Sequence, residues 1–349
     1  MKYHLYYETL KWDVYLKNFF RQDKNRFLRV LQEDFGTKNV FLTRSGRTGI
    51  LLSLKAFGLT REDEVMVPRF MSACVLDAVN HMAVASLHLT ERTKAVLFFH
   101  HWGYQQNYAK AQRVLSPRKL WIIEDCAHGV WGNSQGKGIG AFGHTAIFSL
   151  PKIFEISYAG ALRVNETSLL DHVQKAMDQA ISAKNWWESL RGEWEYLKFY
   201  NAGLERRETM DLQVDLLKWY ATLLQYPQLA TLRGLVPRDI NELREVFHKN
   251  NRHFLSLLKK SRHNGFMLAG DQEDTMAPLC FPVLSDDEIF LNSIVSWLKV
   301  RRIFTGIYHF DVNRCMFEPN NKKCVPIPLH ASLPDGLYAD FIRDYKGRF

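Results

Sequence analysis

The sequence predicts an α/β fold with a mostly parallel central sheet flanked by helices, followed by a smaller C-terminal α+β domain. Two observations carry this prediction. Between Asn39 and Val164, short runs of β-branched and aromatic residues alternate with helix-length segments, which is typical of βαβ units on a parallel sheet. From about Val236 the chain changes to longer helical segments with few strand-like runs between them, which indicates a separate compact module.

The first part of the chain supplies the apolar runs of strand length. We expect strands at residues 39–43, 63–68, 83–88, 94–100, 120–125, 145–150 and 160–164. The segments between the early strands have the amphipathic spacing of helices, at residues 48–58, 72–82 and 107–115. Each such helix would connect two neighbouring parallel strands.

The rest of the chain is predicted to be mainly helical, with a second small sheet. Residues 167–226 have apolar residues at helical spacing, most clearly at 169–181 and 210–224. A Gly and a Pro near residues 228–237 favour a boundary, so we expect a large domain over 1–230 and a small domain over 231–349. The expected elements of the small domain are helices at 241–260 and 287–301, strands at 277–284, 303–308 and 324–329, and a closing helix.

Composition and charge narrow the class of protein. The 349 residues are 46% hydrophobic and 24% charged, with a net charge of +9, which fits a globular protein with anionic partners. The basic residues are dispersed, so we expect phosphorylated small molecules and no nucleic acid. Five cysteines without CxxC spacing predict free thiols and no metal site. Without a signal-like stretch or a run near the ~18 apolar residues of a membrane span, we expect a cytoplasmic protein.

Polar side chains follow the ends of several expected strands. In open α/β sheets, ligands bind in the crevice at the carboxyl ends of the strands. The polar groups in this position are Ser45–Gly49, Pro68–Phe70, His100–Gly103, Glu124–His128, and Ser149 with Lys152. We therefore expect them to meet in one crevice.

Each of these groups also has an ordinary structural explanation. Ser45 or Thr48 could cap a helix by accepting a backbone N–H. Asp125 could be a helix cap or a loop carboxylate, and His128 a loop imidazole. Lys152 could lie along the surface with its ammonium in water.

The functional interpretation assigns three chemical tasks to the same groups. A turn of small residues before a helix presents backbone N–H groups to a phosphate. A carboxylate such as Asp125 keeps a proton on a heterocyclic nitrogen, and a partly desolvated Lys152 is a nucleophile toward an aldehyde. Pyridoxal 5′-phosphate (PLP) needs all three, so the sequence predicts a PLP site with Lys152 and Asp125 as catalytic residues.

The order and the residue patterns of these segments resemble those of the DegT/DnrJ/StrS sugar aminotransferases. These are PLP-dependent enzymes of fold type I, the aspartate-aminotransferase fold. The resemblance is carried by RSGRTG, FFHHWG, IIEDCAHGVWG and GAFGHTAIFSLPK, and it covers about residues 38–165 well and the remainder loosely. It implies cofactor contacts at Gly46, Arg47, Thr48, Asp125, His128, Ser149, Lys152 and Arg206.

The resemblance also implies the role of each contact. Gly46, Arg47 and Thr48 stand at the family's phosphate-binding turn, and Ser149 stands at its phosphate-binding serine. Asp125 stands at the partner of the pyridine nitrogen. His128 stands at the position that contacts the ring near its 3-hydroxyl, and Lys152 stands at the lysine that holds the cofactor covalently. His100 and Trp102 match the histidine and the aromatic residue of the family pattern.

Four departures from the family pattern are visible. About twenty residues usual in the family are missing between His88 and Leu89. Arg206 replaces an asparagine that reaches the phosphate across the dimer interface. The usual Gly-Gly after the lysine is Ala159-Gly160, and Ser72 stands where many members carry an aromatic.

The function implied by the resemblance is amino transfer from an amino-acid donor, usually glutamate, to a nucleotide-linked keto-sugar in surface-polysaccharide or amino-sugar biosynthesis. The protein is then expected to be a homodimer. Two alternatives stay open: a PLP-dependent sugar dehydratase, which has histidine in place of Lys152, and a catalytically silent member that serves as a binding or scaffold protein.

Overall fold

The structure is a computed structural model that describes residues 24–134, 136–153, 159–180, 240–260, 277–330 and 333–345. The expected helix at 210–224, the expected domain boundary near 228–237 and Arg206 lie outside these ranges.

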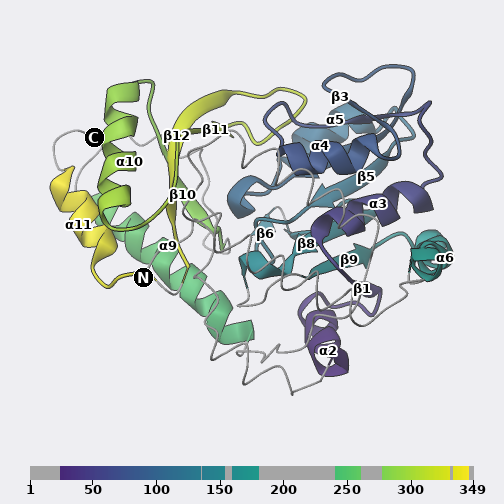
Figure 1. The fold of residues 1–349 in the computed structure, drawn as a ribbon, viewed down its shortest axis with the longest axis horizontal. Helices are drawn as coiled ribbons and strands as arrows, with labels where there is room; N and C mark the ends of the chain where they lie inside the picture. The colour runs from purple at the N-terminus through teal and green to yellow at the C-terminus, as the bar shows by residue number, and fades with distance from the viewer. Residues whose placement is uncertain are drawn as a thin grey trace, which may run out of the picture.

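A seven-stranded sheet forms the centre of the α/β part (Figure 1). Its strands are β1 (Val40–Thr43), β2 (Glu64–Met66), β3 (Val84–Ser86), β4 (Thr93–Phe99), β5 (Trp121–Asp125), β8 (Thr145–Ser149) and β9 (Gly160–Val164). The strand order is β1-β9-β8-β5-β4-β2-β3. Strands β3, β2, β4, β5 and β8 are parallel, and β9 is antiparallel to both of its neighbours. The expected mostly parallel sheet is confirmed.

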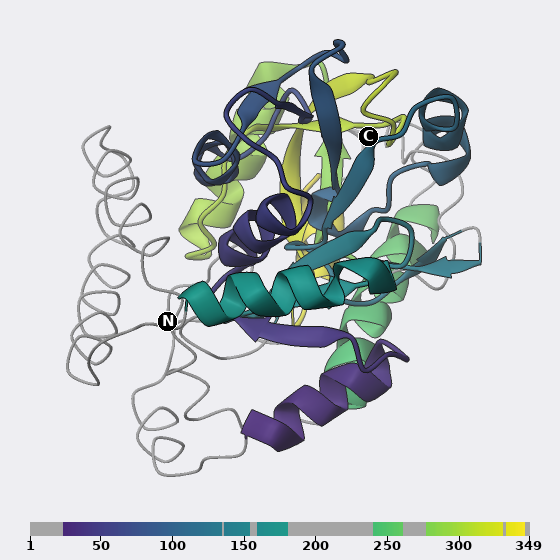
Figure 2. The same ribbon diagram turned by 90° about the vertical axis from the view of Figure 1, so that its right-hand side faces the viewer.

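Helices cover the sheet on both faces. They are α2 (Lys24–Asp34), α3 (Gly46–Ala56), α4 (Ala73–Asn80), α5 (Tyr108–Leu115) and α6 (Leu170–Ala180). Figure 2 shows α3 and α6 side by side on one face, where they share a buried cluster with Leu97 of β4. On the other face, Val96 and Phe98 of the same strand pack with α5. A strand buried on both faces has no polar side, which explains the unbroken apolar run of β4.

The C-terminal part contains a three-stranded sheet with the order β10-β12-β11. Its elements are α9 (Ile240–Lys260), β10 (Cys280–Leu284), α10 (Glu288–Val300), β11 (Tyr308–Asp311), β12 (Asn321–Pro328) and α11 (Leu337–Asp344), and they lie together in Figure 1. Phe254, Leu291, Val325 and Phe341 pack in one buried cluster. None of the helices in the described ranges is long and apolar enough to cross a membrane.

The expected strand at residues 303–308 is wrong. The strand in this region, β11, begins only at Tyr308 and pairs with β12. The reason lies in the turn that follows, where the Asp311 carboxylate accepts N–H groups of Asn313, Cys315 and Asn320. This turn determines which residues face β12, and the apolar residues before Tyr308 are left outside the ladder.

Direct hydrogen bonds join the C-terminal part to the loop after β4. The Leu279 N–H donates to the Trp102 carbonyl at 2.8 Å. The Met316 N–H donates to Oε1 of the buried Gln106 at 3.1 Å. The Trp102 ring also stacks on Phe310 of β11, with 5.7 Å between ring centroids. The end of β4 is therefore held by contacts from both parts of the chain.

Candidate active site

A cavity of about 610 Å³ lies at the carboxyl ends of β1, β4, β5 and β8. The small β-sheet closes one side of it through Tyr308 and His309. Seven of the eight predicted contact residues are described, and six of these line the cavity: Gly46, Arg47, Asp125, His128, Ser149 and Lys152. The structure thus brings together side chains that are more than one hundred residues apart in sequence.

The turn before α3 forms one end of the cavity. Ser45 caps the helix, because its Oγ accepts the Thr48 N–H at 3.3 Å. Ser45, Gly46 and Arg47 line the cavity, so the capping and the anion-binding interpretations of this turn are compatible. Thr48 is buried, with its Oγ1 3.2 Å from Ser45 Oγ, and it lies behind the cavity wall. The first turn of α3 presents its positive end and the Arg47 guanidinium to an anion here.

Close packing around this turn depends on glycine. A Cβ on Gly160 of β9 would lie 2.4 Å from the Ser45 carbonyl carbon, and one on Gly49 would lie 2.8 Å from Ile147 Cγ2. Neither position has room for a side chain. Gly160 is the second member of the Ala159-Gly160 pair. Of the two positions that are usually Gly-Gly, the one without room for a Cβ is therefore still a glycine.

Lys152 ends the short 3-10 helix η2 (Leu150–Lys152), which follows β8 directly. Burial lowers the pKa of its ammonium below the usual range, and the nearby Asp125 carboxylate opposes this shift. A lowered pKa increases the fraction of neutral amine, which is the nucleophilic form. The surface interpretation of Lys152 is therefore not supported by its position in the cavity wall.

Asp125 is the last residue of β5, and its side chain is only 1% exposed. Its Oδ1 accepts the Ala127 N–H at 2.9 Å. Burial raises the pKa of this carboxyl, while the Ala127 N–H and the charge of Lys152 oppose the shift. A cationic ring placed beside Asp125 would restore the ionised carboxylate, since an opposite charge favours the charged form.

His128 is buried and its ring orientation is fixed. Its Nδ1 accepts the Trp102 N–H at 3.2 Å, so the neutral ring carries its proton on Nε2. Burial lowers the pKa of this imidazole well below its usual range, with the charge of Lys152 as a second cause. The neutral ring is therefore a hydrogen-bond donor at Nε2 and an acceptor at Nδ1.

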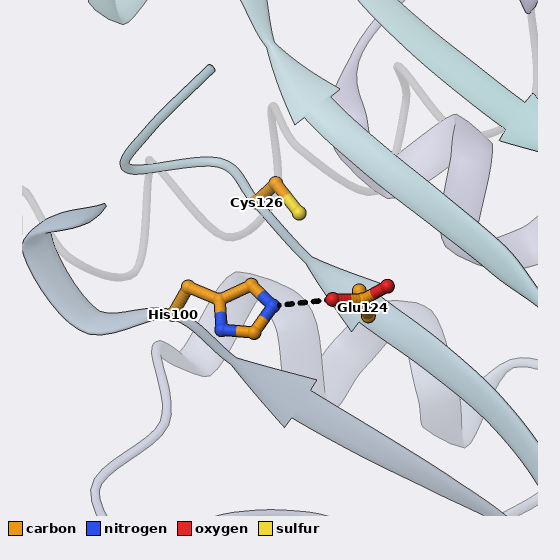
Figure 3. A group of neighbouring side chains, drawn as sticks. All are labelled: His100, Glu124 and Cys126. Atoms are coloured by element: carbon orange, nitrogen blue, oxygen red, sulfur yellow. Dashed lines mark hydrogen bonds and ion pairs between the residues drawn. The ribbon is translucent and has the colours of Figure 1, made fainter. Parts of the chain in front are cut away.

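His100 does not line the cavity. Figure 3 shows it pointing toward Glu124, and its Nε2 lies 2.8 Å from Glu124 Oε2. Tyr108 donates to the same oxygen at 2.7 Å, while the N–H groups of Phe142 and Gly143 donate to Oε1. Burial favours the neutral acid, but the hydrogen bond and charge of His100, with further donors, lower the pKa of Glu124.

Cys126 completes the buried group of Figure 3. The ligand-type atoms of His100, Glu124 and Cys126 lie within 4.8 Å of one another. Both oxygens of Glu124 already accept hydrogen bonds, and His100 Nδ1 accepts the Gln106 N–H at 3.1 Å. The donors that fill this group make it a structural hydrogen-bonded group that supports the strand ends.

His101 is a cavity residue that the sequence analysis placed in the expected crevice but to which it assigned no role. It lines the cavity, and its ring lies 3.9 Å from Trp102 and 5.8 Å from His128. Burial, followed by the charge of Lys152, lowers the pKa of this imidazole to about 3. Strand register provides the missed signal: Phe98 pairs with Glu124 and Phe99 with Asp125. Since side chains alternate between faces, His101 shares the Asp125 side and His100 the Glu124 side.

The donor set fits PLP. A buried carboxylate, a lysine with a lowered pKa and a helix N-terminus with an arginine line one cavity, and its size suits a small cofactor. Glycine at position 160 lets β9 lie directly against the Ser45 turn, where a Cβ would have no room. Fold and site together match those of the PLP-dependent enzymes of fold type I.

Comparison with known proteins agrees with this class. Residues 31–344 match the family described as "Putative PLP-dependent aminotransferase", and the chain belongs to this family. A DegT DnrJ EryC1 StrS aminotransferase from Brucella abortus has the same fold, with a TM-score of 0.66, 13% identity and 96% coverage of both chains. The expected fold, family resemblance and PLP as the family's cofactor are confirmed.

Curated relatives point to sugar aminotransferases. GDP-perosamine synthase from Escherichia coli O157:H7 is 23% identical over 196 residues, which are 50% of this chain and 53% of the relative. The UDP-N-acetyl-3-dehydro-alpha-D-glucosamine 3-aminotransferase from Acidithiobacillus ferrooxidans is 28% identical over 123 residues, 30% of this chain and 33% of the relative. The chain spans about half the length, or less, of these two relatives.

Proposed function

We propose that this protein transfers an amino group from an amino-acid donor, glutamate by family resemblance, to a nucleotide-linked keto-sugar in surface-polysaccharide or amino-sugar biosynthesis. The observation that carries the proposal is the presence of Lys152 and Asp125 in one cavity, each shifting the pKa of the other. The names of the two curated relatives, which specify GDP- and UDP-linked sugars, support the acceptor class.

The chain's own residues divide the work of binding and proton transfer. When bound, PLP supplies an aldehyde conjugated to an electron-accepting ring. The α3 N-terminus, Arg47 and Ser149 bind its phosphate, and Asp125 holds a proton on its ring nitrogen. The Nε2–H of His128 donates a hydrogen bond to the ring oxygen.

Lys152 has two tasks in this proposal. Its neutral Nζ would hold the cofactor covalently in the resting enzyme. When it is not holding the cofactor, the same Nζ would accept the proton from the donor α-carbon and give it back. The burial that lowers its pKa serves both tasks, because a protonated amine could neither bond nor accept a proton.

We place the protein in the cytoplasm as a homodimer, with Arg206 reaching the phosphate of the neighbouring subunit. A guanidinium binds phosphate through two parallel, charge-assisted hydrogen bonds, which a single amide cannot do. Sedimentation at micromolar concentration should give a dimer, and Arg206→Ala should weaken PLP retention while the fold stays intact. A monomer with full PLP occupancy would contradict this assembly.

The test of the function is an absorption titration. Binding to the purified protein should shift the visible absorption band of PLP. Glutamate should then convert this band to the band of the aminated cofactor, pyridoxamine phosphate. Release of 2-oxoglutarate should match the converted cofactor in amount. PLP binding without conversion by any amino acid would favour the catalytically silent alternative, and the absence of PLP binding would overturn the proposal.

A further inference from the structure

A separate cavity of about 530 Å³ lies between the end of α2, the loop that follows His128, strand β9 and helix α9. Among the described residues, none lines both this cavity and the one that contains Lys152. We call it the arginine cavity, because three arginines line it: Arg163, Arg244 and Arg252. Its chemistry is therefore distinct from that of the cofactor site.

Arg163 of β9 is held in a fixed orientation. Its Nε donates to Asn165 Oδ1 at 2.7 Å. Asn165 is fixed in turn, because its Nδ2 donates to the carbonyls of Gly140 and Gly143, each at 2.8 Å. Within the described part of the chain, no hydrogen bond or ion pair engages the two terminal nitrogens of Arg163. One nitrogen therefore orients the guanidinium, and the other two remain as donors.

The charge of Arg163 has no direct counterion among the described residues. The side chain is half-buried, and burial lowers the pKa of its guanidinium, while the charge of Glu124 opposes this shift. Glu124 forms no ion pair with Arg163, and both of its oxygens accept hydrogen bonds from other groups. A half-buried cation without a paired anion costs free energy. An anionic ligand bound to Arg163 would remove this cost.

Helix α9 adds further basic side chains to the arginine cavity. Arg244, His248 and Arg252 all line it. They follow one another at intervals of four residues, so they lie on the same face of the helix. This basic face of α9 and Arg163 of β9 come from distant parts of the sequence and border the same cavity.

Two carboxylates also line the cavity, and neither cancels its positive charge. Both oxygens of Asp34 are engaged, because Oδ1 accepts from Arg244 at 3.2 Å and Oδ2 accepts from Trp131 Nε1 at 2.9 Å. The Glu245 side chain is 70% exposed and lies 3.9 Å from Arg252, so solvent screens its charge. Two carboxylates with three arginines leave the cavity with an excess of positive charge.

We propose that the arginine cavity binds a small phosphate ester, with the phosphate on the terminal nitrogens of Arg163. Two N–H donors of a guanidinium match two oxygens of a phosphate, and a dianion suits the excess of positive charge better than a single carboxylate does. Phe35, Trp131 and Ile139 offer apolar surface to the organic part of the ligand, and the volume is within the range of small-ligand pockets. The site does not depend on the proposed amino transfer.

The experiment measures binding of glucose 6-phosphate by calorimetry. The protein carries one equivalent of PLP, so that the phosphate site of the cofactor is filled. Glucuronate and glucose are the comparison ligands, because they present the same ring with a carboxylate or without charge. Arg163→Gln and Arg252→Gln remove positive charges from the cavity, and Glu245→Gln removes a negative one. Matched controls are Arg61→Gln and Glu91→Gln, at exposed side chains outside the cavity.

Glucose 6-phosphate should bind the wild-type protein more tightly than glucuronate does, and glucose should not bind measurably. Arg163→Gln should weaken the binding by about tenfold or more, and Arg252→Gln by about two- to fivefold. Glu245→Gln should instead strengthen it by about two- to threefold. Both controls should bind like the wild type, and PLP titration should be unchanged in all five variants. Opposite effects of the α9 variants separate a charge effect from a loss of structure.

Three results would overturn the inference: a PLP-loaded wild type that does not bind glucose 6-phosphate, equal binding of glucose, or unchanged binding in Arg163→Gln. Glucuronate binding as tight as that of glucose 6-phosphate would refute the assignment of a phosphate. If Arg163→Gln does not fold, the comparison of Arg252→Gln with Glu245→Gln decides. Equal affinities of these two variants would then overturn the inference.

Discussion

The buried carboxylate of Glu124 provides a quantitative test of how the strand ends are held. Its two oxygens accept four hydrogen bonds, from His100, Tyr108 and the N–H groups of Phe142 and Gly143. Glu124→Gln keeps the shape of the side chain but replaces one acceptor oxygen with an NH₂ donor. The amide must therefore face existing donors in either of its two orientations.

The structure indicates which orientation costs less. An NH₂ group at the Oε1 position would meet two backbone N–H groups that cannot rotate. At the Oε2 position it would meet Tyr108, whose hydroxyl can rotate to accept, and His100, whose Nδ1 is already an acceptor for the Gln106 N–H. One buried donor is left unpaired and the charge-assisted hydrogen bonds to the carboxylate are lost, so the free energy of unfolding should fall by about 3 kcal/mol.

Urea unfolding monitored by tryptophan fluorescence measures this loss. Glu91→Gln, at an exposed glutamate, is the matched control and should stay within about 0.5 kcal/mol of wild type. The folded-state pKa of Glu124 lies below its usual 4.5, so the carboxylate stabilises the fold fully above pH 4.5. The difference between wild type and Glu124→Gln should therefore be constant above that pH and shrink as the pH falls further. A loss below about 1 kcal/mol at pH 7 would refute the reasoning.

Three further changes test the site. Lys152→Ala should reduce amino transfer more than about a hundredfold with the fold intact. Borohydride reduction of the wild type with PLP should label the peptide that contains Lys152, as detected by mass mapping. A label on another lysine would contradict the assignment. Asp125→Asn should retain some PLP but lose turnover by about a hundredfold in a steady-state assay, because an amide cannot hold the ring proton. Near-normal turnover would show that Asp125 only caps the backbone. Gly160→Ala should cost about 1–3 kcal/mol in urea unfolding, since its Cβ would lie 2.4 Å from Ser45, whereas Gly138→Ala, whose Cβ would have 3.9 Å to its nearest atom, should be close to neutral.

The central sheet was predictable because local composition and burial agree. The apolar runs that became β4, β5 and β8 are buried on both faces, so each reads as a continuous hydrophobic segment. Asp125 and Lys152 could be found for the same reason, since a polar residue directly after such a run falls at the ligand edge of a parallel sheet. These predictions needed only the direction of the strands.

The remaining features depend on contacts between distant segments. A cavity lined by both Leu89 and Met316 requires the β3–β4 connection to face residues more than two hundred positions later in the chain. Sequence spacing contains no measure of that approach. The wrong strand at 303–308 has a similar cause, because the pairing of β11 is set by the Asp311 turn and by β12. Local hydrophobicity alone could not identify the start of the strand.

The paired residues at the ends of β4 and β5 make the site sensitive to chain length. In each pair, one member lines the cavity and the other belongs to the buried hydrogen-bonded group: His101 and His100, then Asp125 and Glu124. Deleting one residue within either strand would exchange the two roles while leaving the local composition almost unchanged. Homologous chains should therefore tolerate many substitutions between residues 93 and 125 but accept insertions and deletions only in the loops, outside β4 and β5.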